Sequence, residues 1–410
     1  MKRNFCLLLT AIILLFSGCN EEQPQQKKIR FGGWDYDWIQ KVKSDLNTGG
    51  EKFLPAYNQL IKDADEALEE GVFSVTFKKL MPPSGNKHDY MSMGPYWWPD
   101  PEKEDGMPYI RKDGEINPER NNTDSPQLAG LIKNVRALTL AWYFSGEITY
   151  AEKAAALLRV WFLDEATLMN PHLEYAQVIP GRTPGRFIGV IDATSLQVLV
   201  DAIALLETSG ALTTAENEGI RLWFERYFKW LVESEHGKNE DAYKNNHSVA
   251  YDLQSSSIAY FLGDDDFVAR KVRELPRRRI DPMIEEDGRQ PEELIRTKAF
   301  GYSVANLGNF YRVGERGLEV DVNIFNYVNV KGGSLQKALD YLIQYIGKEE
   351  EWPYQQISGW EQTENNLGLI VRKAARIYEN EAYHRLWTDT FYERLKTDWT
   401  LLVTSEFQKK

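Results

Sequence analysis

The segment Asn245-Asn246-His247-Ser248 places two side-chain amides beside an imidazole, immediately before an apolar run that starts at Val249. Asn and Ser are residue types that cap the first turn of a helix, so one interpretation of this segment is a helix start and nothing more. The other is a site where amide N–H groups face a carboxylate while His247 handles a proton. The residue types alone allow both interpretations.

A second polar segment, from Glu292 to Ser303, carries Arg296, Lys298 and Tyr302. A lone tyrosine in such a place is typically a core or capping residue. Beside an arginine and a lysine, however, a phenol loses its proton more easily than its reference pKa near 10 indicates. Tyr302 is therefore a candidate proton-transfer group, and the two cations are candidates for holding an anion.

The loop from Met81 to Asp124 contains Gly94-Pro95-Tyr96-Trp97-Trp98-Pro99-Asp100-Pro101. Aromatic rings stack on the apolar C–H faces of sugars, which makes Tyr96, Trp97 and Trp98 candidate saccharide contacts, with His88 flanking them. The alternative is that the loop packs its aromatic side chains against itself. Long irregular loops on a rigid scaffold often carry function, so the first interpretation predicts a sugar platform here.

Two further segments are candidates for the same site. The loop from Asn170 to Ile191 carries Arg182 and Arg186, and either guanidinium could pair bidentately with a carboxylate. Arg186, with glycine close by in sequence, is the stronger candidate, whereas Arg182 is more typical of a surface arginine. Trp360 is either an additional sugar contact or a buried packing residue.

Most of the chain around these segments has helical periodicity. Apolar residues recur at three- and four-residue spacing over residues 52–70, 127–144, 150–166, 192–208, 215–233, 247–261, 266–275, 304–311, 334–346, 367–378 and 382–395. Patterns typical of strands are short and few, near Ile110, Val178-Ile179 and Val320 to Val322. The sequence therefore predicts an all-α fold.

Recurring helix ends indicate how these helices are arranged. Tyr143-Phe144-Ser145-Gly146 resembles Tyr260-Phe261-Leu262-Gly263, and each is typical of a helix that stops at a glycine cap. Asn380 could mark a looser third copy. The recurrence predicts about six to seven helical hairpins in series. Such hairpins either stack as an open solenoid or close into a toroid, and the long loops do not fit a regular short repeat.

The N-terminus has the features of an export signal over residues 1–18. Lys2 and Arg3 precede an apolar stretch, Leu7 to Phe16, that is too short to span a bilayer comfortably. Leu15-Phe16-Ser17-Gly18-Cys19 resembles the lipobox of bacterial lipoproteins, which implies cleavage before Cys19 and lipidation of its sulfur. We expect an exported bacterial lipoprotein, periplasmic or anchored at the outer membrane, whose only membrane contact is this lipid.

The remaining chain is expected to consist of a tether over residues 19–29 and a single domain over residues 30–410. Cys6 lies in the signal and Cys19 is committed to lipid, so no disulfide is expected and the core must hold the domain together. We expect a monomer.

The composition excludes one class of partner. The formal net charge is −12, whereas a nucleic-acid-binding surface is basic. The same charge weighs mildly against a polyanionic substrate, although a cleft can be locally basic in an acidic protein. We find no Asp, Glu and His cluster with metal-ligand spacing, and we expect neither a metal nor another cofactor.

Taken together, Asn246-His247, the segment from Arg296 to Tyr302 and the Tyr96-Trp97-Trp98 loop resemble the alginate-lyase superfamily of polysaccharide lyases. With Gly185-Arg186, the loop is similar to polysaccharide lyase family 38, which is associated with glucuronan. The resemblance covers the chain from about Leu80 to Leu386. It implies an incomplete (α/α) toroid with long functional loops. One departure from the alginate lyases is an Arg296-to-Tyr302 spacing one residue shorter, which leaves the role of Arg296 open.

The resemblance also implies a reaction and residue roles. A uronate lyase removes the C5 proton and expels the oxygen linked to C4, which requires a neutralised C6 carboxylate, a base and an acid. Asn246, His247 and Arg296 would neutralise the carboxylate, with Tyr302 as both base and acid on a β-linked glucuronate or mannuronate. On guluronate, His247 would be the base. The further residues expected to bind the substrate are Asn245, Tyr96, Trp97, Trp98, His88, Arg186, Lys298 and Trp360.

Two other function classes fit parts of the sequence. A glycoside hydrolase on a similar toroid would need two carboxylates across the scissile bond, for which Asp124, Asp192, Glu292 and Glu293 are candidates. In a non-catalytic sugar-binding lipoprotein, His247 and Tyr302 would be structural and only the aromatic loop would have a role. Within the lyase class, an alginate lyase that uses the same residues is the alternative to a glucuronan lyase.

Overall fold

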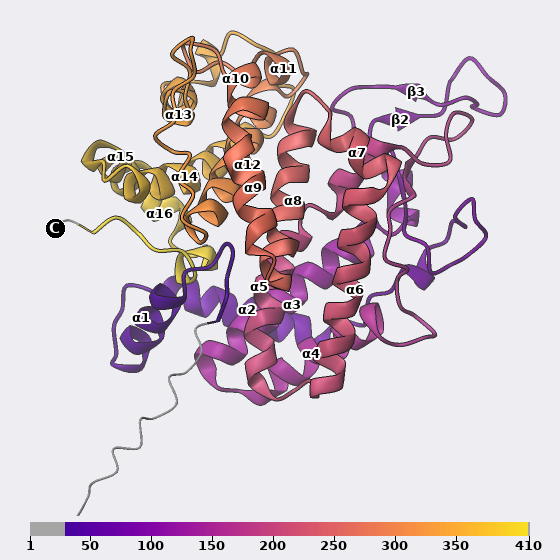
Figure 1. Cartoon of the computed structure of the whole chain (residues 1–410), viewed down its shortest axis with the longest axis horizontal. Helices are drawn as coiled ribbons and strands as arrows, with labels where there is room; N and C mark the ends of the chain where they lie inside the picture. The colour runs from indigo at the N-terminus through magenta and orange to yellow at the C-terminus, as the bar shows by residue number, and fades with distance from the viewer. Residues whose placement is uncertain (1–28, 409–410) are drawn as a thin grey trace, which may run out of the picture.

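A computed structural model describes residues 29–408, and helices dominate it (Figure 1). The expected signal peptide, Cys19 and the tether up to residue 28 lie outside the described residues. The α-helices are α1 (Tyr36–Asn47), α2 (Leu54–Glu69), α3 (Ser125–Ser145), α4 (Ile148–Phe162), α5 (Leu196–Leu206), α6 (Thr214–Glu233), α7 (Glu235–Asp241), α8 (Asn246–Leu262), α9 (Asp265–Leu275), α10 (Asp281–Met283), α11 (Pro291–Leu294), α12 (Ala299–Leu318), α13 (Leu335–Ile343), α14 (Trp360–Ile377), α15 (Glu381–Leu386) and α16 (Tyr392–Leu395).

The long helices form two layers. In the inner layer α3, α5, α8, α12 and α14 pack side by side in this order. In the outer layer α4 and α6 cover the first part of that series, whereas α9, α13 and α15 cover the second part. The ends of the inner series, α3 and α14, do not pack extensively against each other. The predicted incomplete (α/α) toroid is confirmed.

The inner position of α8 explains its composition. Almost every residue of α8 is buried, including the polar run Ser255-Ser256-Ser257, because neighbouring helices cover it on all sides. The Ser256 and Ser257 hydroxyls donate to the carbonyl oxygens of Asp252 and Leu253, at 2.6 and 2.5 Å, so their burial leaves no unpaired hydroxyl. Gly263 ends the helix with a left-handed φ of 91°, as the sequence predicted.

Several predicted boundaries change. The helix predicted at 304–311 begins at Ala299, and the one predicted at 367–378 begins at Trp360. The strand predicted near Val320 to Val322 is wrong: the chain turns there, with Asp321 at a φ of +58°. Helices α1 and α7 were not predicted, since both are short or strongly charged.

The strands form two small two-stranded sheets. Strand β1 (Met91–Met93) pairs in parallel with β4 (Tyr175–Val178), and this pairing connects the two long loops. Strand β2 (Trp97–Trp98) pairs antiparallel with β3 (Ile110–Arg111). Figure 1 shows this β2–β3 hairpin projecting beyond the helices near α7.

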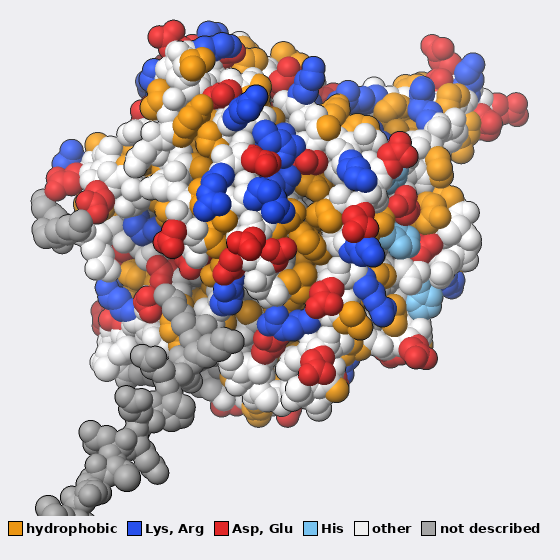
Figure 2. Space-filling model, in the orientation of Figure 1, with side chains coloured by type: hydrophobic (Ala, Val, Ile, Leu, Met, Phe, Trp, Pro, Cys, Tyr) orange, Lys and Arg blue, Asp and Glu red, His pale blue; other side chains and the backbone are white. Residues whose placement is uncertain are grey.

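The outer surface is mixed in charge. Figure 2 shows acidic and basic side chains interspersed over one face, as expected for a solvated surface. The segment Phe187–Ser209, which includes α5, is long and apolar enough to cross a membrane by composition. Because 67% of its most apolar window is buried inside the protein, its apolar character is that of an inner-layer helix.

Candidate active site

A cavity of about 460 Å³ opens where the two long loops meet the N-terminal ends of α8 and α12. It is lined by Pro95, Tyr96, Trp97, Arg111, Gln177, Arg186, Ile188, Ile191, Tyr243, Asn245, Asn246, His247, Glu292, Ile295, Arg296 and Tyr302. Eight of these were predicted site residues: Tyr96, Trp97, Arg186, Asn245, Asn246, His247, Arg296 and Tyr302. The structure therefore gathers most of the predicted site in one place.

The start of α8 supplies both a cap and a site. The Asn245 side chain accepts a hydrogen bond from the His247 backbone N–H at 3.2 Å, so the capping interpretation is correct as geometry. Asn246 and His247 occupy the first turn of the same helix and line the cavity. The positive end of a helix favours an anion at this position, so the capping and site interpretations are compatible.

A buried carboxylate orients the imidazole of His247. Its Nδ1 lies 2.8 Å from Oε1 of Glu240, which comes from α7 and is 0% exposed. Burial raises the pKa of Glu240, and the interaction with His247 opposes that rise. A carboxylate on one ring nitrogen fixes the orientation of the ring and leaves Nε2 for other partners. Glu240 was not predicted, although it lies close to His247 in sequence.

Tyr302 sits in a cluster of polar groups drawn from three parts of the chain. Its hydroxyl lies 2.7 Å from the hydroxyl of Tyr96, and Nη2 of Arg296 donates to it at 2.8 Å. The Arg296 guanidinium also lies 3.9 Å from the centre of the Tyr302 ring. The same Nη2 also donates to Oδ1 of Asp113 at 2.9 Å, so the turn after β3 holds the arginine against the tyrosine.

The protonation of Tyr302 differs from the sequence-based expectation. Burial raises the pKa of its phenol well above the usual range, and the neighbouring Tyr96 raises it further. Arg296 lowers the pKa but does not outweigh burial. Lys298, the other cation expected to help, contributes only the backbone carbonyl that accepts from the Tyr302 N–H at 2.9 Å. The expectation of a readily ionised phenol is therefore wrong.

A second buried carboxylate, that of Glu293, supports the same turn. Its Oε1 accepts from the backbone N–H of Asn246 at 2.7 Å, and the side chain is almost fully buried. Burial raises its pKa from 4.5 to about 7, with the Asn246 N–H and Arg296 opposing. The contact links the segment before α12 to the first turn of α8.

The raised pKa of Glu293 has a consequence for stability. Between pH 4.5 and 7 the folded chain holds a proton that the unfolded chain has released, so the free energy of unfolding falls as pH rises through this window. Glu293→Gln should remove that part of the slope and make the variant more stable than wild type at pH 8, by up to about 3 kcal/mol. Urea denaturation at pH 5 and pH 8 measures the effect. Glu292→Gln, at the neighbouring exposed position, is the matched control, and an unchanged slope in Glu293→Gln contradicts the prediction.

Arg186 also lines the cavity. Its Nη2 donates to Oε1 of Gln177 at 2.6 Å, and Gln177 adopts a left-handed φ of +53°, which is uncommon for a residue with a side chain. Nε2 of Gln177 donates in turn to the buried Asp192 at 2.9 Å. Burial lowers the pKa of Arg186 to about 10, and Asp192 opposes this. The strained Gln177 therefore connects a cavity-lining arginine to a buried acid.

Four predicted substrate-binding residues lie elsewhere. Trp98 packs in the hairpin, where its Nε1 donates to the Glu115 carbonyl at 3.0 Å, and His88 Nδ1 lies 2.7 Å from the Leu168 carbonyl oxygen. Trp360 is buried and stacks on Phe300 at 4.2 Å between ring centres, so its packing interpretation is correct. These three and Lys298 are absent from the cavity lining.

The carboxylates that a hydrolase would need are not arranged across the cavity. Glu292 is the only acid among the lining residues. Asp124 is buried against Lys78 at 3.0 Å, and Asp192 is enclosed by Ser92, Tyr90 and Gln177. Since both classes of glycoside hydrolase use a pair of carboxylates flanking the bond, this geometry does not favour hydrolysis.

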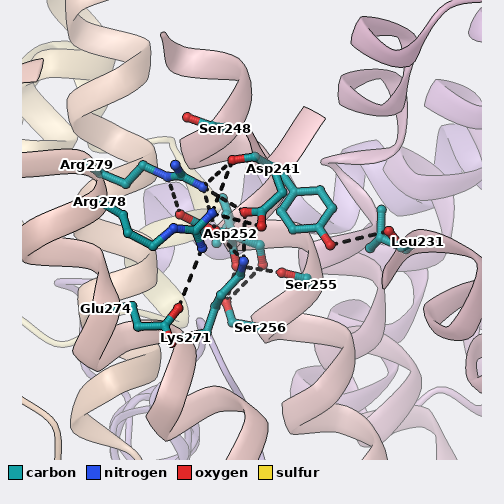
Figure 3. A network of polar contacts seen from close by, with 12 residues as sticks. Leu231, Asp241, Ser248, Asp252, Ser255, Ser256, Lys271, Glu274, Arg278 and Arg279 are labelled. Atoms are coloured by element: carbon teal, nitrogen blue, oxygen red, sulfur yellow. Dashed lines mark hydrogen bonds and ion pairs between the residues drawn. The ribbon is translucent and has the colours of Figure 1, made fainter. Parts of the chain in front are cut away.

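A buried ionic network supports the helix that carries Glu240. Figure 3 shows Lys271, Arg278 and Arg279 converging on Asp241 and Asp252. Arg279 bonds Asp252 through Nε and Asp241 through Nη2, both at 2.7 Å, while Lys271 lies 2.8 Å from Asp241. Lys271 and Arg279, the two ends of the basic run in this part of the chain, are buried here. The network fixes the C-terminal end of α7 next to Glu240.

Within residues 29–408, no group of three or more His, Cys, Asp or Glu side chains could hold a metal ion.

Comparison with known proteins gives a consistent result. A family described as "Alginate lyase" matches residues 74–352. The crystal structure of an alginate lyase from Bacteroides ovatus is 40% identical, with a TM-score of 0.89 over 92% of this chain and 99% of that one. Alginate lyase A1-III from Sphingomonas species A1 shares the fold at 14% identity, with a TM-score of 0.51 over 93% of this chain and 98% of that chain. An A1-III variant complexed with tetrasaccharide, also 14% identical, matches 87% of this chain and 91% of its own with a TM-score of 0.55. No protein of curated function matches the sequence.

Proposed function

Because this chain belongs to the alginate lyase family and is therefore a polysaccharide lyase, we propose that it cleaves a β-1,4-linked polyuronate by β-elimination, with glucuronan as the preferred substrate. The observation that carries the polyuronate assignment is the charge of the cavity. Arg111, Arg186, Arg296 and His247 line it, and Glu292 is the only acid in that lining. Asp113, outside the lining, pairs with Arg111 and Arg296, which leaves Arg186 as the lining arginine without a carboxylate partner in the described chain. In a chain of net charge −12, such a locally basic cleft suits an anionic polymer.

We assign neutralisation of the C6 carboxylate to the first turn of α8. Asn246 and His247 line the cavity from this turn, at the positive end of the helix, and the hydrogen bond to Glu240 leaves Nε2 of His247 available. Neutralising the carboxylate makes the C5 proton acidic enough to remove. Glu240, behind His247, keeps the ring in place.

We assign proton transfer to Tyr302. In β-linked glucuronate or mannuronate the C5 hydrogen and O4 lie on the same side of the ring, so a single group can serve both. The Tyr302 phenolate accepts the C5 proton, the C4–O4 bond breaks, a C4–C5 double bond forms, and the phenol returns its proton to O4. Arg296 stabilises the phenolate from 2.8 Å, in addition to any contact with the substrate.

One assay tests the proposal. The protein is incubated separately with glucuronan, alginate and a neutral glucan, while ultraviolet absorbance of the unsaturated uronate and new reducing ends are both recorded. We expect absorbance to rise fastest on glucuronan. A faster rise on alginate, which the 40% identical alginate lyase makes the second candidate, would reassign the substrate. Reducing ends without absorbance would indicate a hydrolase, and binding without either would indicate a sugar-binding module.

Adjacent tryptophans allow a matched test of the sugar platform. Trp97 lines the cavity whereas Trp98 does not. Trp97→Ala should raise KM on the preferred polymer about five- to tenfold, because it removes about 1 kcal/mol of stacking on a sugar face. Trp98→Ala should change KM less than twofold. Equal effects of the two substitutions in steady-state kinetics would argue against Trp97 as a substrate contact.

We also propose that the protein is an exported lipoprotein anchored through Cys19. The Leu15-Phe16-Ser17-Gly18-Cys19 pattern supports this proposal. In a bacterial host, the wild-type protein should incorporate labelled palmitate and sediment with membranes, whereas the Cys19→Ser variant should remain unlabelled. Labelling of the serine variant would show that the lipid is elsewhere.

A further inference from the structure

A second cavity, here called the chamber, lies within the inner layer of helices. Its volume is about 410 Å³, and it is lined by α3, α5, α12, α14 and segments near both ends of the described chain. None of its lining residues lines the candidate active site. Arg312 in the chamber lies ~15 Å further along α12 than Tyr302, at 1.5 Å per residue. The chamber is therefore a separate place in the toroid.

The charged side chains that line the chamber are all basic. Arg136, Arg312, Arg372 and Lys373 line it, and its lining includes no Asp or Glu. In a chain with 61 acidic and 49 basic residues, four cations without an acid are not expected from composition.

Three of these cations lack an ionic partner. Lys373 pairs with Glu315, but no carboxylate of the described chain lies within ion-pair distance of Arg136, Arg312 or Arg372. Among residues 29–408, Arg136 has no hydrogen-bond partner, its Nε is buried, and its guanidinium faces the ring of Trp399 at 4.7 Å. Arg372 is almost fully buried, and its hydrogen bond within the described chain goes to Thr404, at 2.6 Å.

Burying unpaired guanidinium groups is energetically unfavourable unless an anion binds beside them. Burial lowers the pKa of both Arg136 and Arg372 to about 10, and Asp398 opposes this shift in each case, so both arginines stay charged at neutral pH while burial makes that charge less favourable. Native structures seldom leave buried charges and N–H groups unpaired. An anion in the chamber would satisfy several of these groups at once through charge-assisted hydrogen bonds.

The rest of the lining indicates a ligand larger than a simple ion. Val198, Val304, Leu369 and Ile370 contribute apolar surface beside the guanidinium groups. A volume of about 410 Å³ is in the range of small-molecule sites. An apolar face together with anionic groups is the chemistry of a uronate ring.

Another cavity adjoins the chamber. A neighbouring cavity of about 460 Å³, between α2 and the C-terminal part of the chain, shares Arg136, Asn366, Leu369 and Thr400 with the chamber. It lies where the inner series of helices does not close. Its lining includes Asp63 and Asp398 beside Arg136 and Arg394, and none of its lining residues lines the active site.

We propose that the chamber is a second binding site, separate from the catalytic cavity, for a short saccharide of one or two rings that carries carboxylates. The choice of a uronate rests on the proposed function, whereas the anionic character of the ligand rests on the chamber alone.

Calorimetric titration of the full chain with the β-1,4-linked diglucuronate tests the proposal. Arg312→Gln, on the open side of the chamber, should weaken one class of binding at least tenfold and leave the initial lyase rate on the polymer unchanged. Arg277→Gln, an exposed arginine outside both cavities, carries the same change of charge and should bind as wild type does. Arg136→Met should reproduce the loss, and Arg312→Gln remains decisive if that variant does not fold.

Two further probes define the ligand. Cellobiose should not bind to the chamber, and inorganic phosphate should bind more weakly than the diglucuronate. Identical diglucuronate binding in wild type and Arg312→Gln overturns the proposal, as does tighter binding of phosphate or equal binding of cellobiose. The protein could bind diglucuronate in an Arg312-dependent way and yet show no lyase activity. That result would refute the proposed function but would still support the second binding site.

Discussion

Tyr302→Phe is expected to reduce kcat/KM on the preferred polyuronate by about 10⁴-fold, with the fold unchanged. The upper end of the range for general acid–base catalysis applies because one hydroxyl serves as both base and acid. Phe keeps the ring that the Arg296 guanidinium covers at 3.9 Å, and Arg296 keeps its pair with Asp113, so the local packing survives. Initial rates of ultraviolet absorbance measure the effect, and circular dichroism with thermal melting checks the fold.

A matched control exists in the same cavity. Tyr243 also lines it and meets the His247 ring edge-on at 5.8 Å, but its hydroxyl has no place in the proposed proton path. Tyr243→Phe should therefore retain activity within about fivefold, a loss of about 1 kcal/mol. If Tyr302→Phe keeps more than a tenth of the wild-type rate, Tyr302 is not the proton-transfer group. His247 would then be the base to test, as expected for guluronate.

Sequence periodicity was sufficient to predict the long helices and the all-α class. The glycine ends at Gly146 and Gly263 were correct because a left-handed cap leaves a local signal, with φ of 83° and 91°. Helix α7 left no such signal, since it is short and charged, and its role comes from Glu240, which packs behind His247.

The remaining site residues could not be predicted because they meet through space. Asp113 reaches Arg296 across a sequence separation of 183 residues, and Gln177 depends on an unusual backbone conformation. Proximity in sequence also misled: Lys298 lies close to Tyr302 along the chain but does not line the cavity. Residue type and spacing therefore predicted which segments meet, whereas the direction of each side chain required the structure.

The role of Arg296 is the point at which two mechanisms diverge. If Arg296 only binds the substrate carboxylate, equally in the ground state and the transition state, then removing its guanidinium should raise KM and leave kcat unchanged. The structure instead places it on the hydroxyl and ring of Tyr302 and pairs it with Asp113. In that position it lowers the pKa of a phenol that burial has raised.

Arg296→Lys is accordingly expected to lower kcat by about 10²–10³-fold with a smaller change in KM, because a lysine cannot hold Asp113 and the Tyr302 oxygen with one planar fork. The pH dependence carries the sharper test. Only the ionised phenol accepts the C5 proton, so kcat/KM should rise with pH across the neutral range in the wild type. Loss of the guanidinium raises the Tyr302 pKa, which moves this rise to higher pH in the variant. Arg182→Lys, outside the cavity lining, is the control and should leave the pH profile of kcat/KM unchanged. If the pH profile of Arg296→Lys coincides with that of the wild type and only KM increases, Arg296 binds the substrate carboxylate instead.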